Sequence, residues 1–226
     1  MREIRGRDAA LAVLTDTRFV APPVPAGVRG IGWLRATVGR FASGDDHARR
    51  RALSVEVIAS VAVVPAGDEH PVAVLARGIG IGSSTDVVSL VRAVAQAYQP
   101  GTGDMARADA AVEQLVELLG GAHDEVTAAR IGVLAQACDA TAVLIARARE
   151  RPVAEVLRDD PPVPATKRQA TEAVVVDGVR VEAGEVVLVS LADGLAFGAG
   201  PRQCPGRELA LGLVGSGRAG LTRTGE

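Results

Sequence analysis

One of the two cysteines in the chain lies in a stretch of irregular composition, which reads LAFGAGPRQCPGRELA over residues 195–210. Phe197 precedes Cys204 by seven positions, and Pro205 and a helix-like run follow it directly. Because proline favours the first helical position, the pattern predicts that Cys204 lies at or near a helix N-terminus. Free backbone N–H groups and the helix dipole at such a place favour the thiolate form of a cysteine.

The glycines of this bend indicate a flat ligand. Gly198, Gly200 and Gly206 lack side chains, so the backbone can approach such a ligand closely. A thiolate that lies beside N–H donors and is shielded by Phe197 suits the axial position of a haem iron. The alternative is a cysteine that is only buried or tolerated in a glycine loop.

The spacing of Phe197, Gly200, Cys204 and Gly206 resembles the haem-binding signature of the cytochrome P-450 family. The signature specifies four positions and includes the rare cysteine, so it is far more specific than a lone glycine motif. The resemblance implies that Cys204 is the axial ligand of the iron. It also implies that Phe197, Gly198 and Gly206 take part in binding the cofactor, haem b.

The same resemblance implies two arginine contacts to the haem propionates. Arg202 stands two residues before the cysteine, where such a contact is usual. Arg168 follows a proline-rich segment, and its neighbour Lys167 is the alternative candidate. A guanidinium group suits a carboxylate because it can donate two parallel hydrogen bonds. The other interpretation of Arg168 is a solvated charge on a strand.

His47 and Arg51 are four residues apart, so a helix places them on one face. Together with the preceding segment WLRATVGRF, they resemble the early helix of the family whose histidine and arginine hold the propionates. The alternative is a basic, solvated helix end.

Glu155 and Arg158 match the Glu-x-x-Arg helix of the family, where the two side chains form a buried structural ion pair. Their spacing also places them on one helix face. The alternative is a surface pair on an ordinary helix.

The segment AQACDATAVLI resembles the central helix of the family, which crosses the oxygen side of the haem. Ala137 and Thr141 match the family pattern, whereas Cys138 replaces a glycine and Ala140 stands where an acid is usual. Asp139 is one position early, so it points about 100° away from the usual place of the acid. The resemblance implies that Thr141 hydrogen-bonds bound oxygen and relays protons. Asp139 either assists through water or caps another group, and Cys138 is expected in the core.

The hydrophobic pattern predicts a mainly α fold with a small antiparallel β element, a compact cytochrome P-450-like domain over residues 1–226. Two helices are expected over residues 33–64, with Asp45 or Asp46 as the N-cap of the second. Turn signals at Asp177-Gly178 and Ala183-Gly184 divide the β element. Residues 1–30 are expected to form an N-terminal arm and residues 215–226 a flexible tail.

Composition excludes several classes of protein. The 226 residues carry a formal net charge of −2 with interspersed signs, which argues against a nucleic-acid partner. The N-terminus lacks a signal-peptide core, and we expect no segment that spans a membrane. Two distant cysteines favour a reducing, cytoplasmic location over a disulfide framework. His70 and His123 are expected to be isolated surface residues.

The resemblance implies a haem-thiolate monooxygenase that oxidises a small organic molecule, as in the specialised metabolism of soluble bacterial members. Electrons would come from ferredoxin and ferredoxin reductase. The chain is shorter than a usual member, notably between residues 190 and 195, which leaves two alternatives open. One is a peroxygenase or a non-oxidative haem enzyme. The other is a degenerate member that acts as a partner or scaffold protein.

Overall fold

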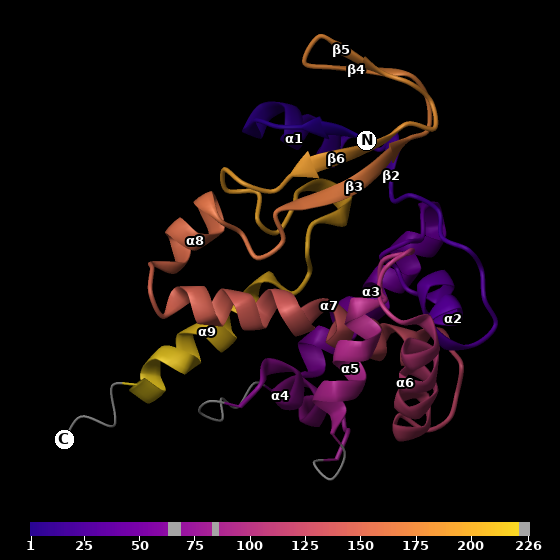
Figure 1. Cartoon of the computed structure of the whole chain (residues 1–226), viewed down its shortest axis with the longest axis vertical. Helices are drawn as coiled ribbons and strands as arrows, with labels where there is room; N and C mark the ends of the chain where they lie inside the picture. The colour runs from indigo at the N-terminus through magenta and orange to yellow at the C-terminus, as the bar shows by residue number, and fades with distance from the viewer. Residues whose placement is uncertain (63–68, 83–85, 222–226) are drawn as a thin grey trace. The chain divides into compact units, whose positions relative to one another are not determined.

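The computed structural model describes residues 1–62, 69–82 and 86–221, the last six without their side chains. The chain divides into two compact units. The first contains Met1–Pro22 and Ala146–Arg207, and the second contains Pro23–Ile145 and the residues from Glu208 onward. Figure 1 labels most of the helices and strands of both units, which are described separately below.

A small mixed sheet organises the first unit. Its strand order is β1-β6-β3-β2, with β1 parallel to β6 and the other pairs antiparallel. The predicted N-terminal arm therefore supplies two strands of the sheet, and the β element is antiparallel except along β1. The strands are β1 (Arg2–Ile4), β2 (Phe19–Val20), β3 (Ala165–Ala170) and β6 (Val186–Ser190).

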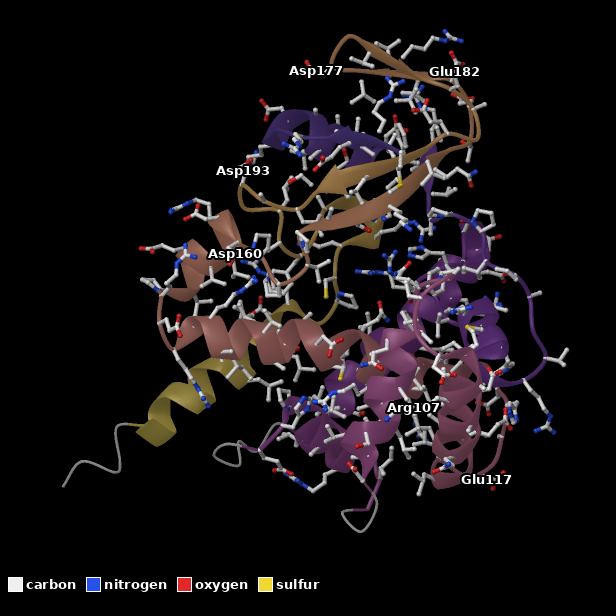
Figure 2. All side chains as sticks on the ribbon, in the orientation of Figure 1. Arg107, Glu117, Asp160, Asp177, Glu182 and Asp193 are labelled. Atoms are coloured by element: carbon white, nitrogen blue, oxygen red, sulfur yellow. The ribbon has the colours of Figure 1, made fainter. Side chains whose placement is uncertain are left out.

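A separate two-stranded hairpin, β4 (Val174–Val176) and β5 (Val179–Val181), completes the β structure of the described residues. Asp177 and Gly178 at its tip both have positive φ, 49° and 73°, which is typical of the tight hairpin turn that the sequence predicts. Figure 2 labels Asp177 at this tip.

The core of the first unit lies between the sheet and helix α1 (Arg7–Thr15). Val187 and Val189 alternate with less buried residues along β6, and both are fully buried. Val13 and Leu14 of α1 lie in the same cluster. The unit also contains α8 (Val153–Asp159) and the short 3-10 helix η1 (Gly200–Arg202).

Helices make up the second unit. The second helix of the predicted pair begins at Gly44, with Ser43 at its N-cap, so Asp45 and Asp46 lie in its first turn instead of capping it. The helices are α2 (Gly30–Thr37), α3 (Gly44–Ser60), α4 (Pro71–Gly78), α5 (Val87–Gln96), α6 (Met105–Leu118) and α7 (Glu125–Ala148), the last of which ends in the first unit.

Helix α9 (Arg207–Leu221) begins at the boundary between the units. It runs through the first residues of the predicted flexible tail, since residues 215–221 are helical. The remainder of that predicted tail, residues 222–226, lies outside the described residues.

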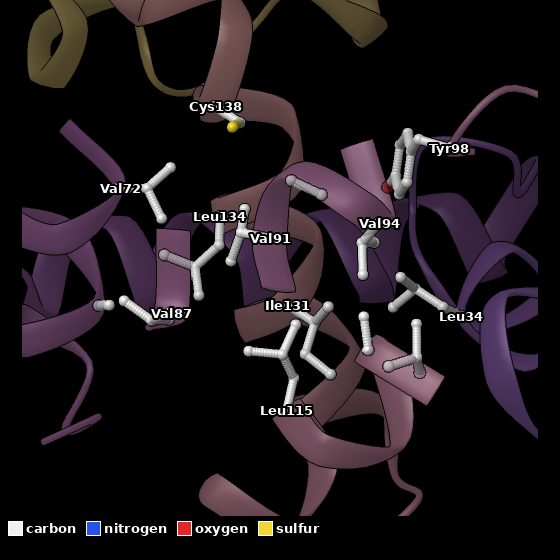
Figure 3. Packing of buried hydrophobic residues seen from close by; sticks show 14 of the residues in the cluster. Leu34, Val72, Val87, Val91, Val94, Tyr98, Leu115, Ile131, Leu134 and Cys138 are labelled. Atoms are coloured by element: carbon white, nitrogen blue, oxygen red, sulfur yellow. The ribbon is translucent and has the colours of Figure 1, made fainter. Parts of the chain in front are cut away.

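Helix α7 is the central element of the core of the second unit (Figure 3). Ile131 and Leu134 of α7 are fully buried, as are Leu34 of α2, Val91 of α5 and Leu115 of α6. Each such side chain stabilises the fold by roughly 1.5–3 kcal/mol. Contrary to the sequence prediction, α7 is long and apolar enough to span a membrane, but 56% of its apolar window is buried, as in a core helix.

Candidate functional site

The loop that contains Cys204 is held by its own backbone. The N–H of Cys204 donates to the carbonyl of Phe197 at 2.8 Å, and the N–H of Gly198 donates to the carbonyl of Leu195 at 2.7 Å. The N–H of Gln203 closes a third turn on the carbonyl of Gly200 at 3.0 Å. Cys204 is exposed within this ordered bend. The loop can therefore present a sulfur without refolding.

The helix after the cysteine starts later than predicted. Helix α9 begins at Arg207, and Pro205 and Gly206 form a turn before it. Cys204 thus precedes the first helical residue by three positions, and Pro205 is not the first residue of the helix. Because the effect of the helix dipole falls off within the first turn, it acts less on the sulfur than expected.

Packing requires a glycine at position 200, for a reason that the sequence alone does not reveal. A Cβ atom there would lie 2.7 Å from the carbonyl oxygen of Leu14 and 2.9 Å from the Cα atom of Thr15, and φ is +67°. The close approach is to the end of α1, so this glycine is required by the fold of the first unit, whatever its role toward a ligand. Gly198 also has a positive φ, 69°.

Phe197 is half-buried, and the guanidinium carbon of Arg207 lies 6.0 Å from the centre of its ring. Arg202 is half-buried at the end of η1. An aromatic ring and a guanidinium group thus accompany the thiol in one loop.

Arg168 and Lys167 point to opposite faces of β3. Arg168 is only 4% exposed, whereas Lys167 is exposed. One terminal nitrogen of Arg168 donates to the hydroxyl of Thr166 at 3.0 Å and to the carbonyl of Lys167 at 2.8 Å. These contacts hold the guanidinium of Arg168 in place, so Arg168 is the better candidate of the two for a carboxylate ligand.

The predicted buried ion pair between Glu155 and Arg158 is not what the structure has. The guanidinium of Arg158 pairs with the adjacent Asp159 at 2.7 Å, and its side chain is 60% exposed. The exposed pair contributes little to stability. What ties the end of α8 to the turn after β6 is a backbone bond, from the N–H of Asp193 to the carbonyl of Arg158 at 2.8 Å.

His47 and Arg51 lie on α3 of the second unit, and both are half-buried. Their neighbours Arg49 and Arg50 are committed elsewhere, because both pair with Glu125 at the start of α7, at 2.9 and 2.8 Å. The two guanidinium groups, that of Arg49 first, lower the pKa of Glu125 to about 2.

Thr141 is 5% exposed on α7. No hydrogen bond from its hydroxyl to the carbonyl of Ala137 is found among the described residues, whereas Thr37 makes the equivalent bond to Trp33 at 2.8 Å. Asp139 is exposed, one position away from Cys138, which is fully buried. Burial first, then Asp139, raises the pKa of the Cys138 thiol to about 11, in keeping with a core role.

Two histidines have partners that the sequence analysis missed. The Nε2 atom of His123 lies 3.1 Å from a carboxylate oxygen of Glu113, and the His123 ring meets Trp33 edge to face at 4.8 Å. The Nδ1 atom of His70 accepts a hydrogen bond from the N–H of Val72 and so caps α4. Only the position of His70 just before Pro71 could have indicated its role.

The predicted site residues divide between the two units. The first unit contains the residues of the cysteine loop and Arg168, and the second unit contains those of α3 and α7. The first group is Phe197, Gly198, Arg202, Cys204, Gly206 and Arg168, and the second is His47, Arg51, Asp139 and Thr141.

Comparison with solved structures identifies the fold. The chain is similar to CalO2 (TM-score 0.73, 19% identity, 96% of this chain and 81% of that chain covered). It is also similar to the cytochrome P-450 BioI, solved with an acyl carrier protein ligated by hexadec-9Z-enoic acid (TM-score 0.71, 17% identity, 96% and 84% covered). A third is the LnmA cytochrome P-450 hydroxylase from the leinamycin biosynthetic pathway of Streptomyces atroolivaceus (TM-score 0.67, 17% identity, 96% and 80% covered). No family profile and no curated protein matches the sequence.

The chain is mainly helical, has a small sheet and carries a cysteine loop before its last helix. These features define its fold class. The protein has the cytochrome P-450 fold, as the signature around Cys204 predicts. At these levels of identity the likeness establishes the fold, and the activity is argued separately below.

Proposed function

We propose that the protein binds haem b through the sulfur of Cys204 and acts as a haem-thiolate monooxygenase. The observation that carries the proposal is the contrast between the two cysteines. Cys204 is exposed in a backbone-bonded loop, whereas Cys138 is buried in the core with a raised pKa. A thiolate ligand needs an accessible sulfur, so Cys204 fits the cofactor and Cys138 does not.

Each unit carries residues that we propose as contacts to the haem or its propionates. In the first unit, Phe197 shields the sulfur, and Arg168 and Arg202 supply guanidinium groups for the propionates. In the second, His47 and Arg51 add donors on one face of α3. A buried arginine such as Arg168 fits a carboxylate, because an ionic partner offsets the cost of burying a charge.

Bound haem with a thiolate ligand supplies oxygen activation, since the thiolate favours cleavage of the O–O bond. In that chemistry, the residues of this chain would deliver protons. Thr141 is buried in the C-terminal half of α7, and its hydroxyl is the group that would pass a proton. Asp139 is exposed one position away and would exchange protons with water.

The substrate proposed is a small organic molecule of bacterial specialised metabolism. The support is the likeness to LnmA, a hydroxylase of the leinamycin biosynthetic pathway. Ferredoxin and ferredoxin reductase are the proposed electron donors, and the cytoplasm is the proposed location.

The position of Asp139, one residue before the usual place of the acid, favours a second candidate. This is a haem-thiolate enzyme that uses peroxide. Ala140 stands where an acid is usual, and this candidate applies if the exposed Asp139 does not replace that acid in the proton route through Thr141. Peroxide already carries the two electrons and two protons that dioxygen would have to receive, so it needs no redox partner and no proton supply from solvent.

Haem titration and turnover test the proposal. The purified apoprotein should bind one equivalent of haem, and Cys138→Ala should bind it equally well. Turnover of a panel of small substrates with dioxygen, ferredoxin and its reductase indicates the monooxygenase, and turnover with peroxide alone indicates the second candidate. A chain that folds but binds no haem contradicts both and supports a scaffold protein.

A further inference from the structure

Helix α3 carries His47 and Arg51, but little apolar packing fixes the half of the helix in which they lie. Val57 is the one buried residue of α3, all of which the structure describes. Val57 packs with Ala129 and Val133 of α7 in a small cluster near the C-terminal end of α3. The N-terminal half therefore depends on polar contacts for its rotation about the helix axis.

Glu125, the first residue of α7, provides those polar contacts. One of its carboxylate oxygens accepts hydrogen bonds from Arg49 at 2.9 Å and from Arg50 at 2.8 Å, and the other accepts from Arg49 at 2.9 Å. The Arg50 side chain is 17% exposed and that of Glu125 29%, so water screens this pair less than an open surface pair.

A third element joins the same network. The second guanidinium arm of Arg50 donates to the carbonyl of Ala36, near the end of α2, at 2.7 Å. The backbone that follows α2 also approaches closely, because a Cβ atom on Gly39 would lie 3.2 Å from the nitrogen of Arg51. Helices α2, α3 and α7 thus meet around Arg50, one residue before Arg51.

This arrangement controls which face of α3 carries the remaining cationic groups. Each residue of an α-helix advances about 100° round the axis. With Arg49 and Arg50 held by Glu125, His47 and Arg51 lie together on a different face. A rotation of the helix that released Arg50 would carry Arg51 with it.

We propose that Glu125 is a positioning residue for a carboxylate-binding face formed by His47 and Arg51. It touches neither group, and acts by holding Arg49 and Arg50 so that α3 keeps one rotation about its axis. The inference rests on the proposed function, because the haem propionates are the carboxylates that this face would bind.

A double-mutant cycle on haem affinity tests this inference. The proteins compared are the wild type, Glu125→Gln, the double variant His47→Ala/Arg51→Ala, and the triple variant. Glu125→Gln keeps the shape of the side chain and removes its charge. In the wild-type background we expect it to raise the Kd for haem about tenfold, about 1.4 kcal/mol. In the double-variant background its effect should fall below about twofold, because the face that it positions is gone.

Glu113→Gln is the matched control. Glu113 also joins two elements of the second unit, since it accepts hydrogen bonds from the N–H of Gly30 at 2.9 Å and from Arg29 at 2.9 Å. It should lower the melting temperature as Glu125→Gln does and leave the Kd for haem unchanged. Glu125→Asp, which keeps the charge, should restore part of the affinity that Glu125→Gln loses.

The outcomes distinguish the positioning role of Glu125 from the proposed haem-binding function. If Glu125→Gln changes the Kd for haem by the same factor in both backgrounds, or by no more than Glu113→Gln does, the positioning role is wrong while the proposed function stands. If the wild type binds haem but His47→Ala/Arg51→Ala leaves the Kd unchanged, the propionate assignment is wrong and the inference falls with it. A wild type that binds no haem overturns the proposed function itself.

Discussion

At the scale of single residues, Cys138 and Cys204 have the same side chain in opposite surroundings. Cys138 packs in the core of the second unit, and burial raises the pKa of its thiol to about 11. Cys204 is exposed in its loop. Because the thiolate is the reactive form, the two should differ strongly in reactivity.

We therefore expect one fast-reacting thiol in the folded apoprotein. At pH 8 a thiol reagent should modify Cys204 quickly and Cys138 only after denaturant is added. Absorbance of the released chromophore measures both phases. Cys204→Ser should remove the fast phase, and a fast phase that survives this substitution would show that the burial assignments are wrong.

Thr141 is a second single residue whose substitution tests the proposed function. Its hydroxyl lies in a buried stretch of α7 and donates no hydrogen bond to the carbonyl of Ala137 in the described part of the chain. A hydroxyl that passes protons during oxygen use predicts that Thr141→Ala keeps haem binding but diverts reductant into peroxide. The ratio of product formed to reductant consumed is the measurement. An unchanged ratio would exclude this role and favour the peroxide-using candidate.

At the scale of elements, a buried arginine joins α2 to the end of α5. Arg35 is 4% exposed, and its guanidinium donates to the carbonyl oxygens of Ala97, Tyr98 and Gln99. These carbonyls directly follow the C-terminal end of α5, where the helix dipole is negative, so a cation there is favourable.

Arg35→Leu should remove the arginine donor from the carbonyls of the buried residues Ala97 and Tyr98, whereas the carbonyl of Gln99 still accepts from Thr102. We expect a loss of free energy of unfolding of at least roughly 1–3 kcal/mol, the cost of one unsatisfied buried group. Urea denaturation followed by circular dichroism measures it. Arg29→Leu is the control, because the Arg29 side chain is 73% exposed and its loss should cost under about 1 kcal/mol. Equal losses in the two variants would contradict this account.

The contact between α3 and α7 should depend on pH. The pKa of Glu125 falls from its ordinary 4.5 to about 2 in the folded chain, with the hydrogen bond from Arg49 as the largest cause. A carboxylate whose pKa is depressed by folding contributes stability that is complete above 4.5 and is lost as the pH falls toward 2.

Glu125→Gln should therefore lower the melting temperature at pH 7 and lower it less at pH 3. The loss at pH 7 should be about 1 kcal/mol, because the Arg49 side chain is 53% exposed and solvent screens part of the interaction. Melting curves of both proteins across this pH range measure the difference. A gap that widens toward pH 3 would contradict the assigned sign.

Local signals predicted most of the elements, and non-local contacts account for what was missed. The turn at Asp177-Gly178 and the pair of helices expected over residues 33–64 follow from short-range patterns. The pairing of β1 with β6 joins residues such as Ile4 and Val189, which no local pattern connects. The same holds for Glu125, whose partners lie 75 and 76 residues away.

Prediction of the candidate site from the sequence was limited in the same way, by contacts that no local pattern specifies. The Cys204 loop was predicted because its residue types and spacing are themselves the signal. The ion-pair partner of Arg158 was not predicted correctly, because Asp159 and Glu155 are both within reach of its flexible side chain. Only the structure shows that Arg158 pairs with Asp159. The packing of Gly200 against the end of α1 likewise depends on a distant segment.

At the scale of the whole molecule, the cytochrome P-450 fold is present in a chain of 226 residues that forms two compact units. The cysteine loop and Arg168 belong to one unit, and α3 and most of α7, including Thr141, belong to the other. That the chain behaves as one haem-binding domain remains a prediction.

The most direct test of the central claim is the absorption spectrum of the reduced, carbon-monoxide-bound protein. A thiolate ligand to the haem iron would shift the Soret band of the carbon-monoxide complex to the red, so the wild type and Cys138→Ala should both show the shifted band. Cys204→Ala should lack it. A shifted band that survives in Cys204→Ala, or that disappears in Cys138→Ala, would contradict the assignment of Cys204 as the iron ligand.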